Sequence, residues 1–523
     1  MLFHVGTLRR LNDSGLLPKI KIISSVSGGS ITAAFLASRW NELRFNKDGK
    51  VDSEMFELVI EKPLRRLADE TLDIPSVSVG LLPLASVGQQ QARQFDKMLF
   101  GNVTLESIAA EDTKYANGPF SWPRAAPRPV FIINATSLQT GERWQFHGRA
   151  MGGLQTLWTD PGKTLLSEAV AASSGFPPML SPVKIEVKNS RDSPALWHDC
   201  NSFERNPYGI DQRAEPGKVI PEDELPLYRE SIYLVDGGVR DNLGLAPIFD
   251  INRLRALRQS PKGLLFTLIS DGGQTYDLDP TPSASSPVQL LRIVGIATSE
   301  PDEIRVESLI RSGQDTIGAM MGQQQQQNPT DNPLECHSDA SALEYQLNHR
   351  ILVSQRYKPH FAYWSIRRMP KHHIGFNCPQ KGQWITPDDV RELSQIPTRF
   401  KKLSPKKQER LINWGYLAAH HGLPYIPLFW NPPEQRKAIL SKCSLPYEKI
   451  GIGRASAVGI TGWMSISAHS RLPITITGRK SAAISSISRY GSIRPNSQLT
   501  LPHKTAAFKS RISGMILTLM KES

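Results

Sequence analysis

The sequence predicts an α/β protein with a mainly parallel central sheet, followed by a mostly helical region. Strand and helix patterns alternate between residues 20 and 275, as they do in chains that build parallel sheets from βα units. Three predicted strands lead to Ser27, Asp236 and Asp271, each beside glycine. Ligands of such sheets bind at the carboxyl ends of the strands. These three residues are therefore the first candidates for a site.

The chain opens with a predicted helix over residues 2–16, where apolar residues recur at helical spacing. An apolar, β-branched run follows and ends at Ser24. A turn of small residues then leads into a second helix, which we expect to run to about Arg44. A strand, a tight turn and a helix in this order are the context of a nucleophile elbow.

The turn itself reads Ser25-Val26-Ser27-Gly28-Gly29. It fits the pattern G-x-S-x-G with serine in place of the first glycine, so Ser27 is the candidate nucleophile. The N-terminus of the following helix favours negative charge, and we expect the Gly28 N–H to stabilise an oxyanion. The alternative is a serine- and glycine-rich turn that binds a phosphate or has no ligand.

The segment between the Ser27 turn and Asp236 contains both predicted helices and predicted strands. We expect helices over about 52–110 and 165–172, and a strand over 130–136 with a hairpin partner at 144–146. Residues 189–229 are rich in Pro, Asp and Asn, which is typical of a long surface insertion.

A further predicted strand, over 231–235, ends at Asp236-Gly237-Gly238. A serine hydroxyl needs a base to become a nucleophile. Asp236 at a strand end fits this role, and Gly237 and Gly238 would allow close approach of backbone and substrate. Asp271 has the same local form but continues into a loop, so it ranks second. The 12 histidines leave a Ser-His-Asp triad open, although none stands at a predicted strand end after the elbow.

Beyond residue 275 the pattern is mainly helical. We expect helices over 288–297 and 304–321 and helices that begin at Thr386 and Ser404, with one strand over 361–366. From about 451 the sequence has no clean periodicity, which indicates a disordered tail or one unrelated to the body. The predicted domains are 1–275, a helical extension over 276–450, and the tail over 451–523.

Composition describes a globular protein with a basic tail. The net charge is +13, but residues 451–523 alone hold ten Lys or Arg and one acid, Glu522. The folded body is therefore not expected to bind nucleic acid. No signal peptide or membrane-spanning run is found, and the four cysteines have no zinc spacing. We expect a cytoplasmic protein without a metal.

The motifs around Ser27 and Asp236 together resemble those of the patatin-like phospholipases. Two further stretches support the resemblance, 134–136 and 172–177, and it covers about residues 1–275. It implies a three-layer α/β domain, with Ser27 as nucleophile and Asp236 as general base of a Ser-Asp dyad. It also implies a phospholipid or other acyl-lipid substrate met at a membrane surface, an acyl-enzyme, and no cofactor. A basic tail would add about 1 kcal/mol per Lys or Arg near anionic lipid.

The sequence departs from this family at its start. The family supplies further oxyanion donors from a glycine-rich loop after its first strand, and this chain starts within the helix that follows. We therefore expect a shortened domain or another segment in place of the loop. Losing an oxyanion donor typically costs about 10²–10³ in rate. A catalytically impaired protein that binds lipids or a partner, and an acyltransferase with the same dyad, stay open as alternatives.

Overall fold

The computed structural model describes residues 1–71, 87–109, 128–153, 155–177, 182–187, 197–198, 220, 223–248, 265–273, 360–367, 386–396, 402–423, 445–447 and 513–520. The α-helices are α1 (Leu2–Asp13), α2 (Gly28–Arg39), α3 (Ser53–Phe56), α4 (Lys62–Ala68), α6 (Val87–Phe95), α7 (Leu166–Ser174), α8 (Leu225–Glu230), α9 (Gly238–Asp241), α13 (Pro387–Ser394) and α14 (Pro405–Gly422). Short 3₁₀ or π segments are η1 (Leu17–Lys19), η2 (Trp40–Glu42), η3 (Glu57–Glu61), η4 (Asp96–Phe100) and η5 (Glu106–Ile108). The strands are β1 (Ile20–Ser27), β2 (Val130–Ser137), β3 (Arg143–Phe146), β4 (Met151–Gly153), β5 (Leu157–Thr159), β6 (Val183–Glu186), β7 (Trp197–His198), β8 (Ser231–Asp236), β9 (Leu265–Asp271), β10 (His360–Ser365) and β11 (Ser513–Met520).

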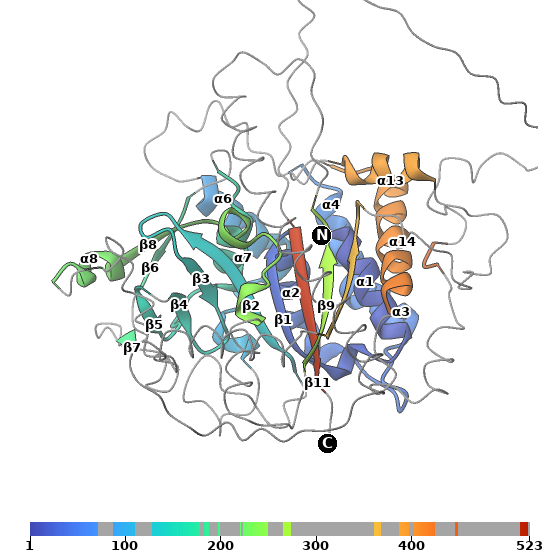
Figure 1. Ribbon diagram of the computed structural model, residues 1–523, viewed down its shortest axis with the longest axis horizontal. Coiled ribbons are helices and arrows are strands. Elements are labelled where there is room, and N and C mark those ends of the chain that lie inside the picture. The colour runs from blue at the N-terminus through green and yellow to red at the C-terminus, as the bar shows by residue number, and fades with distance from the viewer. Residues whose placement is uncertain are drawn as a thin grey trace, which may run out of the picture. The chain divides into compact units, whose positions relative to one another are not determined.

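Within the described residues, the strands form one sheet of 11 strands in the order β10-β9-β11-β1-β2-β3-β4-β5-β7 (Figure 1). Strand β8 joins from the side, between β2 and β6. The α/β class predicted from the sequence is confirmed, because helices surround a central sheet.

The expectation of a mainly parallel sheet is wrong for this part of the chain. Only β1–β2 and β9–β10 are parallel, and the other eight described pairs are antiparallel. The reason lies in the connections: β2 to β5 follow one another with links of three to five residues, which are too short for the crossover that a parallel pair requires. The sheet is mixed.

Alternate residues of the central strands pack on opposite faces of the sheet. In β1, Ile23 packs with the core formed by α1, α2, α7 and α14, whereas Ile22 packs with Leu243, Leu245 and Ile248 on the other face. The same alternation continues across β2, β9, β10 and β11, as the two-residue period of a strand requires. Both faces of the central sheet are therefore buried, and the ends of the strands are left for a site.

Helices α1 and α14 cross at two glycines. A Cβ on Gly6 would lie 2.0 Å from the carbonyl oxygen of Ile412, and one on Gly415 would lie 1.8 Å from that of Phe3. Glycine is required at both positions because the two backbones touch there. Helix α14 and strand β10, both from the predicted extension over 276–450, thus complete the core and the sheet of the first domain, within one compact unit.

Strand β11 comes from the tail for which the sequence predicted disorder. It lies between β1 and β9 and is antiparallel to both. Met515, Ile516 and Leu517 are fully buried, and the red strand in Figure 1 marks its central place in the sheet. The expected lack of structure does not hold for Ser513–Met520, because this eight-residue segment carries the apolar run Met515-Ile516-Leu517 and is long enough to fill a central strand position.

Several local predictions are confirmed. Strand β2 and its hairpin partner β3 form as expected, and Thr386 caps α13 through a capping box with Asp389. The first strand runs to Ser27 rather than Ser24, and the helix after it ends at Arg39, followed by η2. The helices predicted over 288–297 and 304–321 lie outside the described residues, as does most of the insertion over 189–229.

The described end of that insertion is the helix α8, where the sequence indicated only a loop. In the parts of the chain that are described, no helix has the length and apolar character needed to cross a membrane.

Candidate active site

The turn after β1 holds Ser27 in a backbone conformation that few residues adopt. Its φ is 53° and its ψ is −124°, and among the described residues Asn102 is the only other non-glycine residue with a positive φ. Such strain persists only where the surroundings enforce it, and it is concentrated at functional sites. The turn is closely packed: a Cβ on Gly29 would lie 2.0 Å from the carbonyl oxygen of Gly514 in β11. The sequence-predicted elbow is therefore present, with Ser27 at its apex and 5% exposed.

Ser27 and Asp236 are brought together by strand pairing rather than by parallel strand ends. Strand β3 occupies one edge of β2, and β1 and β8 share the other: β1 pairs with residues 130–133 and β8 with residues 135–137. Because β1 is parallel and β8 antiparallel to β2, the two strands run toward each other and end face to face. Ser27 ends β1 and Asp236 ends β8.

The Asp236 carboxyl group is fully buried, and its two oxygens differ. Oδ1 accepts a hydrogen bond from the Gly238 N–H at 2.9 Å. Among the residues described, Oδ2 has no hydrogen-bond partner. Burial raises the pKa of Asp236 to about 8, and the Gly238 N–H and the Ser27 hydroxyl oppose this rise. The hydroxyl thus lies beside the carboxyl, although no hydrogen bond of normal length joins Ser27 to Oδ2; catalytic hydrogen bonds are often long without substrate.

The backbone around Asp236 is fixed by contacts to α7 and β2. The Asp236 N–H donates to the carbonyl of Gly175 at 3.0 Å, and the Thr136 hydroxyl donates to the carbonyl of Asp236 at 3.0 Å. A Cβ on Gly237 would lie 2.3 Å from the carbonyl oxygen of Asn134. Gly237 therefore permits the close approach of two backbone segments, which was expected of this glycine.

Three side chains for which no catalytic role was predicted also hold the elbow. The Asn134 amide donates to Ser24 Oγ and to the Ser25 carbonyl, both at 2.9 Å. The hydroxyl groups of Ser173 and Ser30 lie 2.8 Å apart beneath the turn. Asn134 and Ser173 both belong to stretches that supported the family resemblance, and this was the only signal that pointed to them.

Gly28 is the first residue of α2 and is half-buried. The first N–H groups of a helix lack intrahelical acceptors, so its N–H can face a developing oxyanion beside Ser27. The Ser27 N–H, by contrast, donates to Ser173 Oγ at 3.1 Å. Val26 is fully buried within β1 and has no polar group to contribute.

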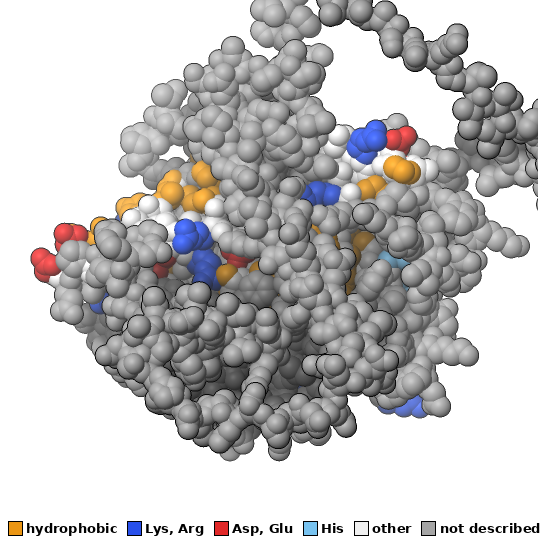
Figure 2. All heavy atoms as spheres, in the orientation of Figure 1, with side chains coloured by type: hydrophobic (Ala, Val, Ile, Leu, Met, Phe, Trp, Pro, Cys, Tyr) orange, Lys and Arg blue, Asp and Glu red, His pale blue; other side chains and the backbone are white. Residues whose placement is uncertain are grey.

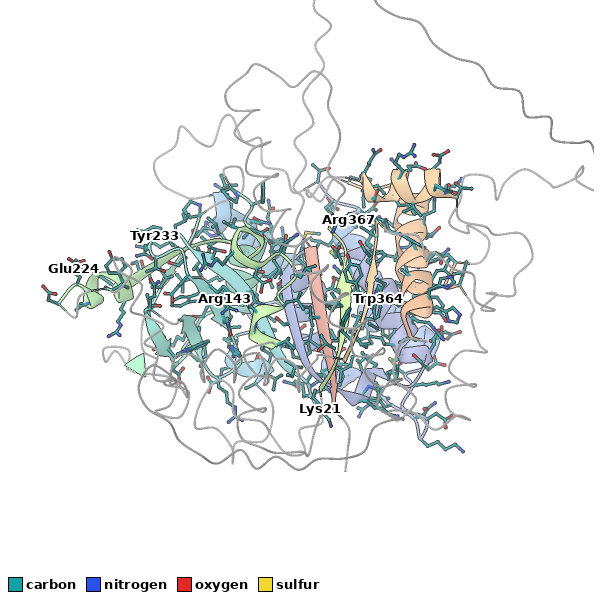
Figure 3. All side chains as sticks on the ribbon, in the orientation of Figure 1. Lys21, Arg143, Glu224, Tyr233, Trp364 and Arg367 are labelled. Atoms are coloured by element: carbon teal, nitrogen blue, oxygen red, sulfur yellow. The ribbon has the colours of Figure 1, made fainter. Side chains whose placement is uncertain are left out.

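Asp271, the second candidate carboxylate, is occupied elsewhere. Its Oδ2 forms an ion pair with Arg367 at 2.7 Å and accepts a hydrogen bond from Tyr363 at 2.7 Å. Burial would raise its pKa, but the Arg367 charge and these hydrogen bonds lower it below its usual value. Figure 3 shows Trp364 on β10 and Arg367 just after this strand, which lies on the far side of β11 from β2. Asp271 is thus a charged structural partner of β10.

Two buried histidines among the described residues contact polar side chains. His4 Nδ1 contacts Ser270 Oγ at 2.9 Å and His147 Nε2 contacts Gln145 at 3.1 Å. Burial lowers the pKa of both histidines. The described residues contain no group of three or more His, Cys, Asp or Glu side chains that could hold a metal ion.

The fold and the site define an α/β domain with a nucleophile elbow that faces a buried carboxyl group. Residues 1–249 match the sequence model of the patatin-like phospholipase family. Residues 1–249 therefore form a patatin-like phospholipase domain. A comparison with curated proteins found no match to the chain.

Proposed function

We propose that the chain is a serine lipid-acyl hydrolase that cleaves acyl esters of membrane lipids with Ser27 and Asp236. The observation that carries the proposal is the meeting of β1 and β8 on one edge of β2, which sets a strained serine beside a buried carboxyl oxygen without a described partner. A serine adjacent to a base is the signature of covalent catalysis.

The reaction follows from these positions. The ionised Asp236 accepts the proton of the Ser27 hydroxyl while Oγ attacks the ester carbonyl, and the Gly28 N–H stabilises the oxyanion. The tetrahedral intermediate expels the alcohol, which takes the proton from Asp236, and leaves an acyl-enzyme on Ser27. Water, deprotonated by the same carboxylate, then attacks the acyl group, the fatty acid leaves, and Ser27 Oγ takes the proton back from Asp236.

Exposed apolar side chains on β8 and on the elements next to it support a lipid surface as the place of action. Leu138 is 55% exposed, Leu227 71%, and Tyr233 and Val239 38% each. They lie after β2 and on α8, β8 and α9. Figure 2 shows hydrophobic side chains gathered on the described part of this face near α6 and β8. Val239 lies three residues after Asp236 and the other three lie toward the start of β8, and exposed apolar side chains of this kind suit contact with a lipid surface.

A catalytically impaired lipid-binding protein is the second candidate. It is favoured by the single oxyanion donor that we identify, Gly28, and by the raised pKa of Asp236, which keeps much of this carboxyl protonated at neutral pH. Acyl transfer to an alcohol would use the same acyl-enzyme and differ only in the acceptor.

Labelling of the full chain with a fluorophosphonate probe tests the proposal. We expect labelling at pH 8 that is lost in Ser27→Ala and reduced at least 10²-fold in rate in Asp236→Asn. Fatty-acid release from phosphatidylcholine vesicles, with and without added alcohol, then separates hydrolysis from transfer. Folded protein that is not labelled at any pH between 6 and 10 would contradict the proposal and favour the lipid-binding alternative.

A further inference from the structure

One residue at the end of α7 contacts both halves of the site. The Ser173 hydroxyl accepts a hydrogen bond from the Ser27 N–H at 3.1 Å. The carbonyl of Ser173 accepts one from the Gly237 N–H at 3.3 Å. Ser173 is fully buried, so neither contact is shared with solvent. Its side chain therefore holds the elbow, and its main chain holds the turn that follows Asp236.

The hydrogen-bonding capacity of this hydroxyl is fully used. It donates its proton to the carbonyl of Asn134 at 2.7 Å and accepts from the Ser27 N–H. A hydroxyl group has one proton and two lone pairs, so with this proton on Asn134 the contact with Ser30 Oγ at 2.8 Å draws on the one Ser30 proton, which Ser25 Oγ also accepts. Ser30 Oγ also lies 3.1 Å from Ser25 Oγ. Ser173 is thus the central member of a hydroxyl chain beneath the nucleophile.

The contact with the Ser27 N–H matters because of the conformation of that residue. A positive φ at a residue with a side chain is unfavourable and relaxes unless neighbouring groups enforce it. The Ser173 hydroxyl fixes the peptide group that precedes the Ser27 Cα, and the neighbouring Asn134 amide fixes the Ser25 carbonyl. Together they determine the direction in which Oγ leaves the turn.

We propose, on the basis of the proposed function, that Ser173 is a positioning residue that holds the Ser27 hydroxyl toward Asp236 by binding the Ser27 N–H. It touches no substrate and transfers no proton. Its removal changes how often Ser27 Oγ is in line for attack, and leaves the Asp236 carboxyl and the substrate contacts in place.

The expected effect is a loss in kcat without a change in KM. A displacement of about 1 Å at a reacting atom can lower a rate by about 10²-fold, so we expect kcat and the rate of fluorophosphonate labelling to fall 10–100-fold in Ser173→Ala. The midpoint of the pH profile is expected to remain that of the wild type, because Asp236 keeps its burial and its bond from Gly238.

Ser174→Ala is the matched control. Ser174 is the next residue of α7, is 4% exposed, and donates only within its own helix, to the Val170 carbonyl at 2.7 Å. Both variants remove one buried hydroxyl from the same helix end. Only Ser173→Ala removes a contact with the elbow, so Ser174→Ala is expected to retain kcat within twofold.

Three measurements on the full chain decide the matter: kcat and KM on vesicle-bound phosphatidylcholine, the labelling rate from pH 6 to 10, and the unfolding temperature. Normal kcat per titrated active site in Ser173→Ala, or an equal loss in Ser174→Ala, would overturn the inference. If Ser173→Ala does not fold, Ser173→Cys keeps the shape with a weaker acceptor, and a kcat equal to that of the wild type would overturn it equally. If the wild type is not labelled at all, the proposed function fails first.

Discussion

At the residue scale, the buried Asp236 carboxyl determines when the site can work. Its pKa is raised to about 8, chiefly because burial disfavours the charge. A general base must be ionised before it can accept a proton. The same burial that makes the carboxylate a strong base therefore keeps it protonated over much of the range below pH 8.

We predict an ascending pH profile for the labelling of Ser27. The rate should rise about tenfold per pH unit well below pH 8 and level off above it, because only the ionised Asp236 activates the hydroxyl. Second-order labelling rates from pH 5 to 10 measure this directly. A profile that rises with a midpoint near 6.5 would instead point to a histidine base.

The same pKa predicts a pH-dependent gain in stability for Asp236→Asn. The native state holds this proton between about pH 4 and 8 whereas the unfolded state releases it, so stability falls as pH rises through that window. Asparagine removes the penalty, and the gain should be near zero at pH 4 and on the order of 1–3 kcal/mol at pH 8.5. Urea unfolding at both pH values measures it. Asp388→Asn, at an exposed carboxylate of α13, should show no such difference.

At the scale of elements, the crossing of α1 and α14 packs the first helix of the chain against a helix about 400 residues later. The backbones meet at Gly6 and Gly415, and the Tyr416 hydroxyl donates to Asp13 at 2.8 Å beside them. Since α1 leads through η1 directly into β1, the position of α14 is transmitted to the strand that carries the elbow.

We therefore expect Gly415→Ala to destabilise the protein. The added methyl group would lie 1.8 Å from the Phe3 carbonyl oxygen, and overpacking of this kind costs about 1–3 kcal/mol. Thermal unfolding should show a lower midpoint, with loss of labelling only at temperatures where the variant unfolds. Lys406→Ala, at an exposed position of α14, is the control and should unfold like the wild type.

At the scale of the whole molecule, strand β11 connects two parts of the sheet. It pairs with β1 on one side and β9 on the other, and a Cβ on Gly514 would lie 2.6 Å from the Asn242 carbonyl oxygen, in the segment after α9. It thereby touches the elbow side and the Asp236 side of the molecule at once.

Deletion of residues 509–523 is expected to abolish labelling and to cause aggregation. Without β11, the edges of β1 and β9 would be unpaired, and exposed edges associate with one another. Size-exclusion chromatography and labelling measure the two effects. Deletion of residues 521–523 alone, which leaves β11 intact, should change neither. A monomeric and normally labelled 509–523 deletion would show that β11 is dispensable.

The sequence predicted those features that depend on neighbouring residues. The elbow at Ser27, the β2–β3 hairpin and the Thr386 cap each follow from a short pattern of small, alternating or capping residues. The face-to-face meeting of β1 and β8 could not be predicted in this way, because strand direction depends on pairing between segments that are about 100 residues apart. The role of Ser173 was hidden for the same reason: its partner Ser27 lies 146 residues away.

The position of β11 in the sheet also has a consequence for the protein during its synthesis. Strand β1 leaves the ribosome nearly 500 residues before Met520 does, a delay of about 25–100 s at 5–20 residues per second. During that time the central position of the sheet is empty, so the nascent chain presents unpaired strand edges to chaperones and carries no finished elbow. The Ser27 turn would thus stay without its β11 neighbour until residues 513–520 have been synthesised.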